Sequence, residues 1–442
     1  MFALIQGGRP PVGRVRVSGA KNSATRLLAA ALLADQTVNL GNFPTRILDA
    51  EVKAAFARKL GASIVFDHEN ERVTIDATDF EARTASRSDF DLPIRTTYLL
   101  AAPQVVRSGI ARVPYPGGCP IGPKSGGSRG YDLHVMVWKS LGAEVTERAD
   151  HIEVRTRHGC FIGADINFPI STVGGTENAL MCAAVARGRT EIANAYITPE
   201  IEDLIELLRR MGASIAVHGT SHIVVDGRAG RLSGANMDVM ADRIEALTWI
   251  VFSVLAGGEL VVEGVPFGSM EVPLLHLSHA GIDLFRNSTS VIARPECLVS
   301  GQVQPFEVSC GAHPGVISDM QPLFALLALA AAGTSRIYDY RYPDRIGFVA
   351  ELAKLTNAEA LQAERGKIVV KGPTAFRAGA ANSTDLRGSI AALIAAFCAP
   401  GQSRIDNIQM ALRGYNDLAS KLLRLGLNIS ILEHEAVLGA TG

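Results

Sequence analysis

The sequence predicts an α/β fold of two domains, each an inside-out α/β barrel in which sheets surround buried helices. Two observations lead to this prediction. A βαβαββ-type unit is repeated six times along the 442 residues, three units per domain, with a period of about 70 to 80 residues. The first helix of each unit is apolar nearly all round, as in residues 323–330, and such a helix has to be buried on every side.

Each unit closes on a Leu-Gly-Ala turn or a variant of it, and these turns are centred on residues 61, 142, 212, 281, 357 and 426. The second helix of a unit, such as 202–210, has apolar positions at helical spacing and one charged face. We expect one domain at 22–240 and a second formed by 1–21 plus 241–442, with the active site in the cleft between them.

The bulk properties narrow the class of protein. The formal net charge is −1, so the whole chain carries no signal for a nucleic-acid partner. Six cysteines show neither a CxxC pair nor zinc-ligand spacing, which predicts no metal site and reduced thiols in a cytoplasmic protein. The sequence contains no run of eighteen apolar residues, so we expect no membrane span.

One stretch, 115–134, predicts a lid. Cys119 stands there among glycines with two cations, Lys124 and Arg129, and without a carboxylate until Asp132. Such surroundings favour a reactive, accessible thiolate, and the glycine backbone can present N–H groups to an anion. The alternative is a surface loop whose cysteine is incidental. The rest of the chain favours the lid.

Polar residues gather where the buried helices begin, and helix N-termini favour anions. Taken alone, Arg243 or Asp385 could equally be a helix cap or a rim salt bridge. Arg345 and Arg413 add cations in the last two units. Together these positions predict a site for a small polyanion, with Asp319 as the carboxylate that accepts a proton from an attacking hydroxyl. The helix-start residues are Lys21, Asn22, Arg95, Thr172, Val173, Gly174, Asp242, Arg243, Asp319, Asp385 and Arg387.

The motifs resemble, in order and over essentially the whole chain, those of the UDP-N-acetylglucosamine enolpyruvyl transferases (1-carboxyvinyltransferases). That family implies an inside-out α/β barrel in each domain. It also implies transfer of the enolpyruvyl group of phosphoenolpyruvate to a sugar hydroxyl by addition and elimination, with phosphate released and no cofactor. The matching motifs are Gly19-Ala-Lys-Asn22, Gly117-Gly-Cys119-Pro-Ile-Gly122, Asp132-Leu-His134, Asp242-Arg-Ile-Glu245, Asp319-Met-Gln321, Thr384-Asp-Leu-Arg387 and Arg413-Gly-Tyr415.

The resemblance also implies residue roles. Cys119, Asp319, Lys21 and Arg413 would be catalytic, with Cys119 the acid or covalent partner at the donor. Phosphoenolpyruvate would be bound by Lys21, Arg95, Lys124 or Arg129, Arg387 and Arg413. The acceptor, a uridine nucleotide, would be bound by Asn22, Asp132, Leu133, His134, Thr172, Val173, Gly174, Asp319 and Arg345. Asp242, Arg243, Glu245 and Asp385 would support the site.

Two departures from the family pattern keep the acceptor open. The segment from Cys119 to Asp132 has five extra residues and lacks the family's Arg-Pro-Val core, so the lid cation is Lys124 or, slightly favoured, Arg129. Ile170 stands where the family carries a lysine. UDP-N-acetylglucosamine, for peptidoglycan synthesis, remains the first hypothesis, and a ribose hydroxyl of UMP in nucleoside-antibiotic synthesis is the alternative. A non-catalytic nucleotide-binding regulatory protein is the hypothesis from another class. The oligomeric state is left open.

Overall fold

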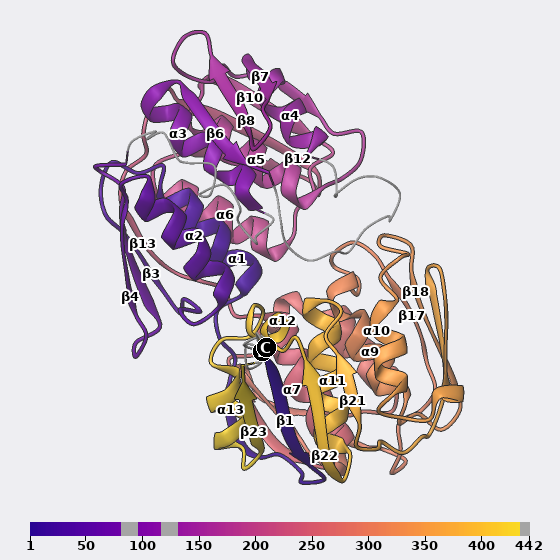
Figure 1. Cartoon of the computed structure of the whole chain (residues 1–442). Coiled ribbons are helices and arrows are strands. Elements are labelled where there is room, and N and C mark those ends of the chain that lie inside the picture. Colours follow the sequence, from indigo (N-terminus) through magenta and orange to yellow (C-terminus); the bar gives the residue numbers. More distant parts are fainter. Residues whose placement is uncertain (81–95, 116–130, 434–442) are drawn as a thin grey trace, which may run out of the picture. The chain divides into compact units, whose positions relative to one another are not determined.

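The structure is a computed structural model of the chain and describes residues 1–80, 96–115 and 131–433 (Figure 1). These residues fall into two compact units. The first, here the Lys21 unit, holds the described residues from Ser18 to Ala241. The second, here the Arg387 unit, holds Met1–Val17 and the described residues from Asp242 onward. Both units mix helices and sheets, which confirms the predicted α/β class at this level.

Three sheets build the Lys21 unit. The first has the order β13 (Ala235–Asp238), β3 (Val38–Gly41), β5 (Arg72–Asp76) and β4 (Ser63–Asp67). The second has the order β11 (Ser214–His218), β12 (His222–Arg228), β10 (Arg187–Ala193) and β9 (Asp165–Asn167). The third has the order β6 (Ile110–Pro114), β8 (His151–Thr156) and β7 (Ala143–Glu147).

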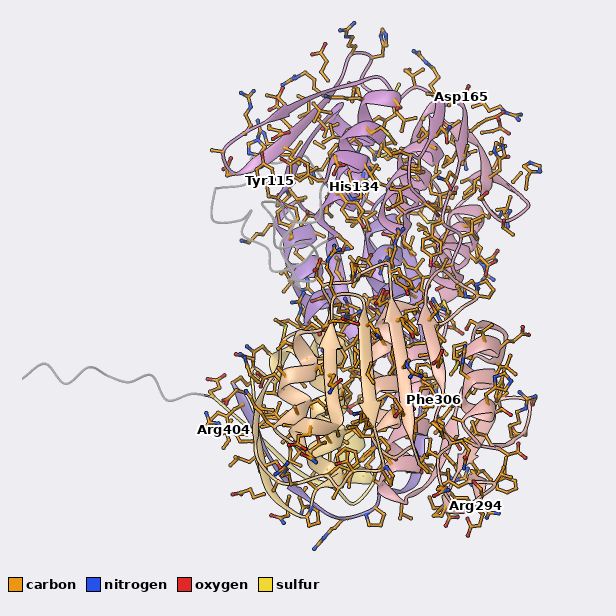
Figure 2. All side chains as sticks on the ribbon, turned by 90° about the vertical axis from the view of Figure 1, so that its right-hand side faces the viewer. Tyr115, His134, Asp165, Arg294, Phe306 and Arg404 are labelled. Atoms are coloured by element: carbon orange, nitrogen blue, oxygen red, sulfur yellow. The ribbon has the colours of Figure 1, made fainter. Side chains whose placement is uncertain are left out.

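Three further sheets build the Arg387 unit. The first has the order β21 (Ala380–Asn382), β22 (Gly401–Asp406), β1 (Phe2–Gly7) and β23 (Asn428–Leu432). The second has the order β15 (Phe285–Arg286), β16 (Ser290–Ala293), β14 (Glu259–Glu263) and β2 (Val12–Arg16). The third has the order β17 (Glu307–Cys310), β18 (Thr334–Asp339), β20 (Lys367–Lys371) and β19 (Leu361–Glu364), and Figure 2 shows it from its outer face with helices behind it.

The sequence repeat reappears in the strand pairing. In each four-stranded sheet one edge strand pairs in parallel with its neighbour, and the next two pairs are antiparallel, as in β17–β18–β20–β19. The sheet β6–β8–β7 has the same antiparallel pairs. The start of the chain takes part in this pattern, because β1 lies between β22 and β23 and β2 pairs with β14. All six sheets stay separate, and no closed barrel forms among the described residues.

The helices of the Lys21 unit fill the space within its sheets. They are α1 (Lys21–Ala31), α2 (Leu48–Lys59), η2 (Thr96–Leu100), α3 (Ala101–Ser108), α4 (Asp132–Ser140), α5 (Val173–Val185) and α6 (Pro199–Arg210). From Gly175 onward α5 is buried at every position, so it lacks a solvent face, as expected for a helix that is apolar all round. By contrast, α6 buries one face and exposes Glu202, Glu206, Arg209 and Arg210.

The Arg387 unit follows the same plan. Its helices are α7 (Arg243–Ala256), η3 (Phe267–Ser269), α8 (Glu271–His279), η4 (Pro295–Cys297), η5 (Ser318–Met320), α9 (Gln321–Ala328), α10 (Gly347–Ala353), η6 (Ala358–Ala360), α11 (Leu386–Cys398), α12 (Gln409–Leu412) and α13 (Leu418–Arg424). Helices α7, α9 and α11 contact one another in the interior of the unit. The apolar run predicted at 323–330 lies mostly within α9, whose residues are all buried. No helix in the described ranges combines the length and the apolarity needed to cross a membrane.

Candidate active site

Two carboxylates cap buried helices in the Arg387 unit. Asp242 precedes α7, and its Oδ1 accepts hydrogen bonds from the backbone N–H groups of Ile244 (2.8 Å) and Glu245 (3.2 Å). Asp385 does the same for α11, accepting from Arg387 N at 3.0 Å and Gly388 N at 3.2 Å. Burial raises the pKa of Asp242, an effect that the nearby Arg387 opposes. Both residues therefore act as helix caps, one of the two roles that the sequence left open for Asp385.

Arg345 ties these helix starts together. Its Nη1 donates to Ser318 O at 2.9 Å and to Asp319 Oδ1 at 2.8 Å, and its Nη2 donates to Asp385 Oδ1 at 2.8 Å. Burial alone would lower the pKa of Arg345, but Asp385 and Asp319 outweigh burial and raise it. Because its terminal nitrogens already bond to protein groups, Arg345 braces η5 against the start of α11.

Arg387, the second residue of α11, is placed differently. Its side chain is 2% exposed, Nε lies 3.6 Å from Asp319 Oδ2, and the guanidinium sits 5.4 Å from the centre of the Tyr415 ring. None of its three nitrogens donates a hydrogen bond of normal geometry to an acceptor among the described residues. Tyr415, Asp319 and Asp242 nevertheless outweigh burial and raise the pKa of Arg387, so protein groups hold this guanidinium charged, and it is a candidate for binding an anionic ligand in this unit.

The other residues of this unit that the sequence motifs contain are buried or nearly so. Tyr415 is buried, its hydroxyl lies 2.8 Å from Thr248 Oγ1, and burial raises its pKa to about 12. Arg413 directly follows α12 and is 8% exposed. Arg243 approaches His313, with Nη1 and Nδ1 3.3 Å apart. Glu245 accepts from Trp249 Nε1 at 3.0 Å and pairs with Lys421, so it stabilises the helix packing.

In the Lys21 unit, Lys21 is the first residue of α1, and its Nζ lies 3.0 Å from Asp49 Oδ2 on α2. The Lys21 side chain is 17% exposed, whereas that of Asp49 is 8% exposed. The next residue, Asn22, is half-buried, and its carbonyl accepts a hydrogen bond from Arg26. The start of α1 therefore presents a cation that a buried carboxylate orients.

Sequence reasoning missed a buried group of charges in the same unit. It is formed by Arg26 on α1, Lys53 on α2 and Glu177 on α5. Arg26 donates to Glu177 Oε1, while Tyr98 Oη donates to Glu177 Oε2 at 3.0 Å. Lys53 is fully buried on α2 and donates to Thr25 O and Thr96 Oγ1, both at 2.7 Å. One sequence signal could have found it, since Lys53 occupies the apolar stripe that α2 forms with Ala50, Ala54 and Ala57.

The predicted acceptor residues divide between α4 and α5. His134 is buried on α4 and stacks on Tyr98, with ring centres 3.6 Å apart, whereas Asp132 is exposed and Leu133 half-buried. Thr172 caps α5 by accepting from Gly175 N at 3.3 Å, and Val173 begins the helix. A Cβ at Gly174 would come within 2.8 Å of the Tyr98 hydroxyl, so any side chain there would force Tyr98 to shift. Tyr98 thus contacts both His134 on α4 and the start of α5 at Gly174.

Four predicted residues lie outside the described residues, namely Arg95, Cys119, Lys124 and Arg129. Their roles stay predictions. Among the described cysteines, Cys160, Cys182, Cys297, Cys310 and Cys398 are free thiols. Burial raises the pKa of Cys182, Cys310 and Cys398, the last to about 12, so these thiols are unreactive near neutral pH.

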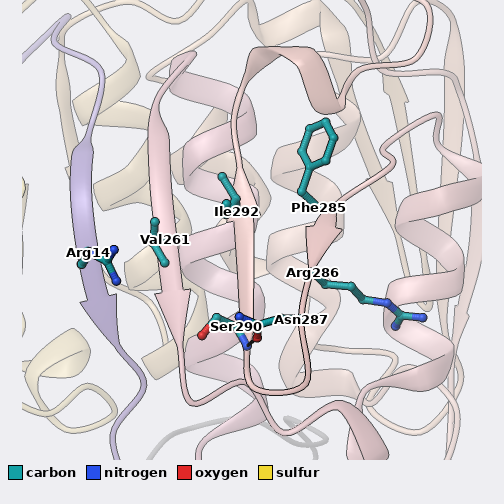
Figure 3. Close-up of a pocket in the computed structure, with 7 residues that line it drawn as sticks. All are labelled: Arg14, Val261, Phe285, Arg286, Asn287, Ser290 and Ile292. Carbon is teal, nitrogen blue, oxygen red and sulfur yellow. Dashed lines mark hydrogen bonds between the residues drawn. The ribbon is translucent and has the colours of Figure 1, made fainter.

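A pocket of about 340 Å³ lies elsewhere, on the outer face of the β15–β16–β14–β2 sheet (Figure 3). It holds none of the predicted site residues. Its Arg14 pairs with Glu263 at 2.8 Å, and its Arg286 lies over Phe267 at 5.6 Å, so both cations already have partners. The candidate site therefore rests on the buried polar groups at the helix starts. The pocket is lined by Arg14, Val261, Phe285, Arg286, Asn287, Ser290 and Ile292.

The model of the EPSP synthase (3-phosphoshikimate 1-carboxyvinyltransferase) family matches residues 5–422, and the chain belongs to this family. The chain is accordingly an enzyme of the enolpyruvyl transferase type.

The chain is similar over its full length to named relatives and to solved structures. UDP-N-acetylglucosamine 1-carboxyvinyltransferase from Zymomonas mobilis is 34% identical over 430 residues, covering 96% of this chain and 98% of the relative. The protein of the same name from Acidobacterium capsulatum is 35% identical, covering 97% of this chain and 95% of the relative. The crystal structure of the enolpyruvyl transferase NikO from Streptomyces tendae superposes with a TM-score of 0.86 at 26% identity, covering 97% and 98% of the two chains. EPSP synthase from Acinetobacter baumannii shares the fold, with a TM-score of 0.70 at 17% identity over 97% of this chain and 100% of that one.

Proposed function

We propose that the chain transfers the enolpyruvyl group of phosphoenolpyruvate to a hydroxyl of a uridine nucleotide, first of all the 3-hydroxyl of UDP-N-acetylglucosamine. The observation that carries this choice of acceptor is the full-length similarity, at 34% identity, to a protein that bears that activity in its name. The motifs at the helix starts of the Lys21 unit and of the Arg387 unit support the same choice. Peptidoglycan precursor synthesis would be the corresponding role.

The proposed reaction has two steps. The acceptor hydroxyl adds to C2 of phosphoenolpyruvate while C3 gains a proton, which gives a tetrahedral phospho-ketal. The C2–O bond to phosphate then breaks and C3 loses a proton, which restores the double bond in the product. Asp319 would accept the hydroxyl proton and Cys119 would donate the proton to C3.

The donor carries a phosphate and a carboxylate, and both suit guanidinium and ammonium groups. We assign Lys21, Arg387 and Arg413 to this anion, with Arg95 and the lid cation, Lys124 or Arg129, as further contacts. Arg387 is the best supported of these, because its buried guanidinium makes no hydrogen bond of normal geometry among the described residues, although Tyr415, Asp319 and Asp242 stabilise its charge. Binding of the donor would then supply the missing acceptors.

One observation favours a second acceptor. Ile170, two residues before the α5 cap Thr172, is 52% exposed, and an exposed isoleucine cannot neutralise a diphosphate. An acceptor with one phosphate, such as UMP modified at a ribose hydroxyl, would place less demand on this position. The uridine itself would contact the segment that holds Asp132, Leu133 and His134 in either case.

The deciding experiment measures phosphate release from phosphoenolpyruvate with UDP-N-acetylglucosamine and with UMP, each offered separately. We expect turnover with UDP-N-acetylglucosamine. Turnover with UMP alone would replace the first acceptor by the second. If neither acceptor supported turnover although both bound, a non-catalytic nucleotide-binding role would be favoured.

Two variants test the catalytic assignments. Cys119→Ala and Asp319→Ala should each lower the rate of phosphate release by about a hundredfold or more, because each removes a proton-transfer group. Cys398→Ala is a matched control. Cys398 is the last residue of α11, at the opposite end of the helix from Arg387, and burial raises the pKa of its thiol. Unchanged phosphate release in Cys119→Ala and Asp319→Ala would refute the proposed mechanism.

A further inference from the structure

Lys53 and Asp49 stand four residues apart on α2 and therefore share one face of that helix. Both reach α1, which lies beside α2 (Figure 1). Asp49 pairs with Lys21 at 3.0 Å, and Lys53 donates to Thr25 O at 2.7 Å, one turn further along α1. Two successive turns of α1 are thus attached to two successive turns of α2.

Lys53 also reaches a third element. Its Nζ donates to Thr96 Oγ1 at 2.7 Å, at the beginning of η2. The side chain is 0% exposed, so it cannot contact a ligand directly. Lys53 therefore acts on the site through the elements that it joins. One of these elements, α1, begins with the site residue Lys21.

We propose that Lys53 is a positioning residue for the anionic donor, because its ammonium group fixes the first two turns of α1 against α2 and η2 and thereby places Lys21. This inference rests on the proposed function. It adds a residue that touches neither substrate and that sets how well the site binds phosphoenolpyruvate. The sequence motifs that define the site do not include it.

The charges around Lys53 couple its proton to the ligand. Lys21 and Arg26 face it from α1, Asp49 from its own helix and Glu177 from α5. The pKa of Lys53 is lowered to about 7, mainly by burial and also by Arg26 and Lys21, while Glu177 and Asp49 oppose that effect. A phosphate or carboxylate bound at Lys21 would favour the charged form of Lys53, so donor binding should draw a proton onto it.

The experiment compares wild type with Lys53→Met and Lys53→Arg, and uses Lys59→Met, an exposed lysine of α2, as the matched control. Isothermal titration calorimetry with phosphoenolpyruvate alone, at pH 8 in two buffers of different ionisation enthalpy, measures affinity and proton uptake. Steady-state phosphate release with the active acceptor gives kcat and KM across pH 6 to 9.

We expect Lys53→Met to weaken donor affinity roughly tenfold or more, to raise KM for phosphoenolpyruvate accordingly, and to abolish part of the proton uptake. In wild type, kcat/KM for the donor should decline above a pH of about 7. That decline should be absent in Lys53→Met and shifted to higher pH in Lys53→Arg. Lys59→Met should behave as wild type.

A Lys53→Met variant with wild-type affinity, proton uptake and pH profile would overturn the inference. So would a variant that loses affinity while keeping the wild-type pH profile, because that result indicates damage to packing alone. The proposed function has a separate test, since a wild type that binds phosphoenolpyruvate without turning over either acceptor still allows the Lys53 comparison. A wild type that binds no phosphoenolpyruvate would refute both.

Discussion

Replacing Lys53 by methionine should change the stability of the Lys21 unit in a pH-dependent way. In the folded chain burial lowers the pKa of Lys53 from 10.5 to about 7. Between these two values the unfolded chain holds a proton that the folded chain has released. Stability contributed by this group therefore rises with pH across that window, and below pH 7 folding bears the full cost of burying the charge.

The magnitude follows from the shift. At about 1.4 kcal/mol per pKa unit, burying the charge costs about 5 kcal/mol well below pH 7 and almost nothing above pH 10. Methionine has a similar length and no charge. The unfolding free energy of Lys53→Met minus that of wild type should therefore be more positive at pH 6 than at pH 10, by about 4 kcal/mol. The charge-dependent part of the hydrogen bonds to Thr25 and Thr96 is already contained in the pKa of Lys53, and only their charge-independent part cancels in this difference.

The chain offers a specific reporter for this unit. It has two tryptophans, and Trp138 is buried in the Lys21 unit while Trp249 lies in the Arg387 unit. In a Trp249→Phe background, urea unfolding followed by fluorescence reports on the unit that holds Lys53. Lys59→Met in the same background is the control. A stability difference that stays constant from pH 6 to pH 10 would refute the assignment of a buried, pKa-shifted lysine.

Three further predictions concern the helix starts. Arg345→Met should lower the unfolding free energy of the Arg387 unit by about 3 to 5 kcal/mol, measured by Trp249 fluorescence, because it leaves Asp385 buried without its partner; an unchanged midpoint would contradict the bracing role. Arg387→Lys should raise KM for phosphoenolpyruvate about tenfold in the phosphate-release assay, since an ammonium group cannot bind an oxyanion through two nitrogens, and unchanged KM would remove it from the donor site. Thr172→Ala should cost about 1 kcal/mol through loss of the α5 cap, whereas Thr172→Ser should cost little, as read by Trp138 fluorescence.

Much of the fold could be predicted because its determinants are local. The closing turn of each unit and the apolar helix are repeated in the sequence, and the same strand pairing recurs in the sheets that they help to build. The caps at Asp242 and Asp385 were also accessible, since a carboxylate before an apolar helix satisfies backbone N–H groups within three residues. The separate sheets could not be distinguished from a closed barrel, because closure depends on hydrogen bonds between strands that are distant in the sequence.

The sequence predicted many of the residues at the candidate site, but not which of these residues bond to one another. Arg345 was predicted to bind the acceptor as a cation of the fifth repeated unit, yet its bonds to Asp319 and Asp385 span 26 and 40 residues. Lys53 was missed altogether because lysines are rarely fully buried, so a lysine within an alanine stripe is normally taken for a surface residue. Its partners on α1 and η2 become visible only once the three elements are packed together.

Two neighbouring arginines show how burial and pairing together separate a structural role from a binding role. Arg345 and Arg387 are both almost fully buried, and both lie near Asp319. Arg345 has its terminal nitrogens bonded to two carboxylates and a carbonyl, so a ligand would have to displace protein acceptors to reach it. Arg387 lies near Asp319, Asp242 and the face of Tyr415, which hold it charged, but its nitrogens make no hydrogen bond of normal geometry among the described residues, so an incoming oxyanion need not displace one. The same residue type thus serves this unit as a fixed brace at Arg345 and, under the proposed function, as a group that binds the donor at Arg387.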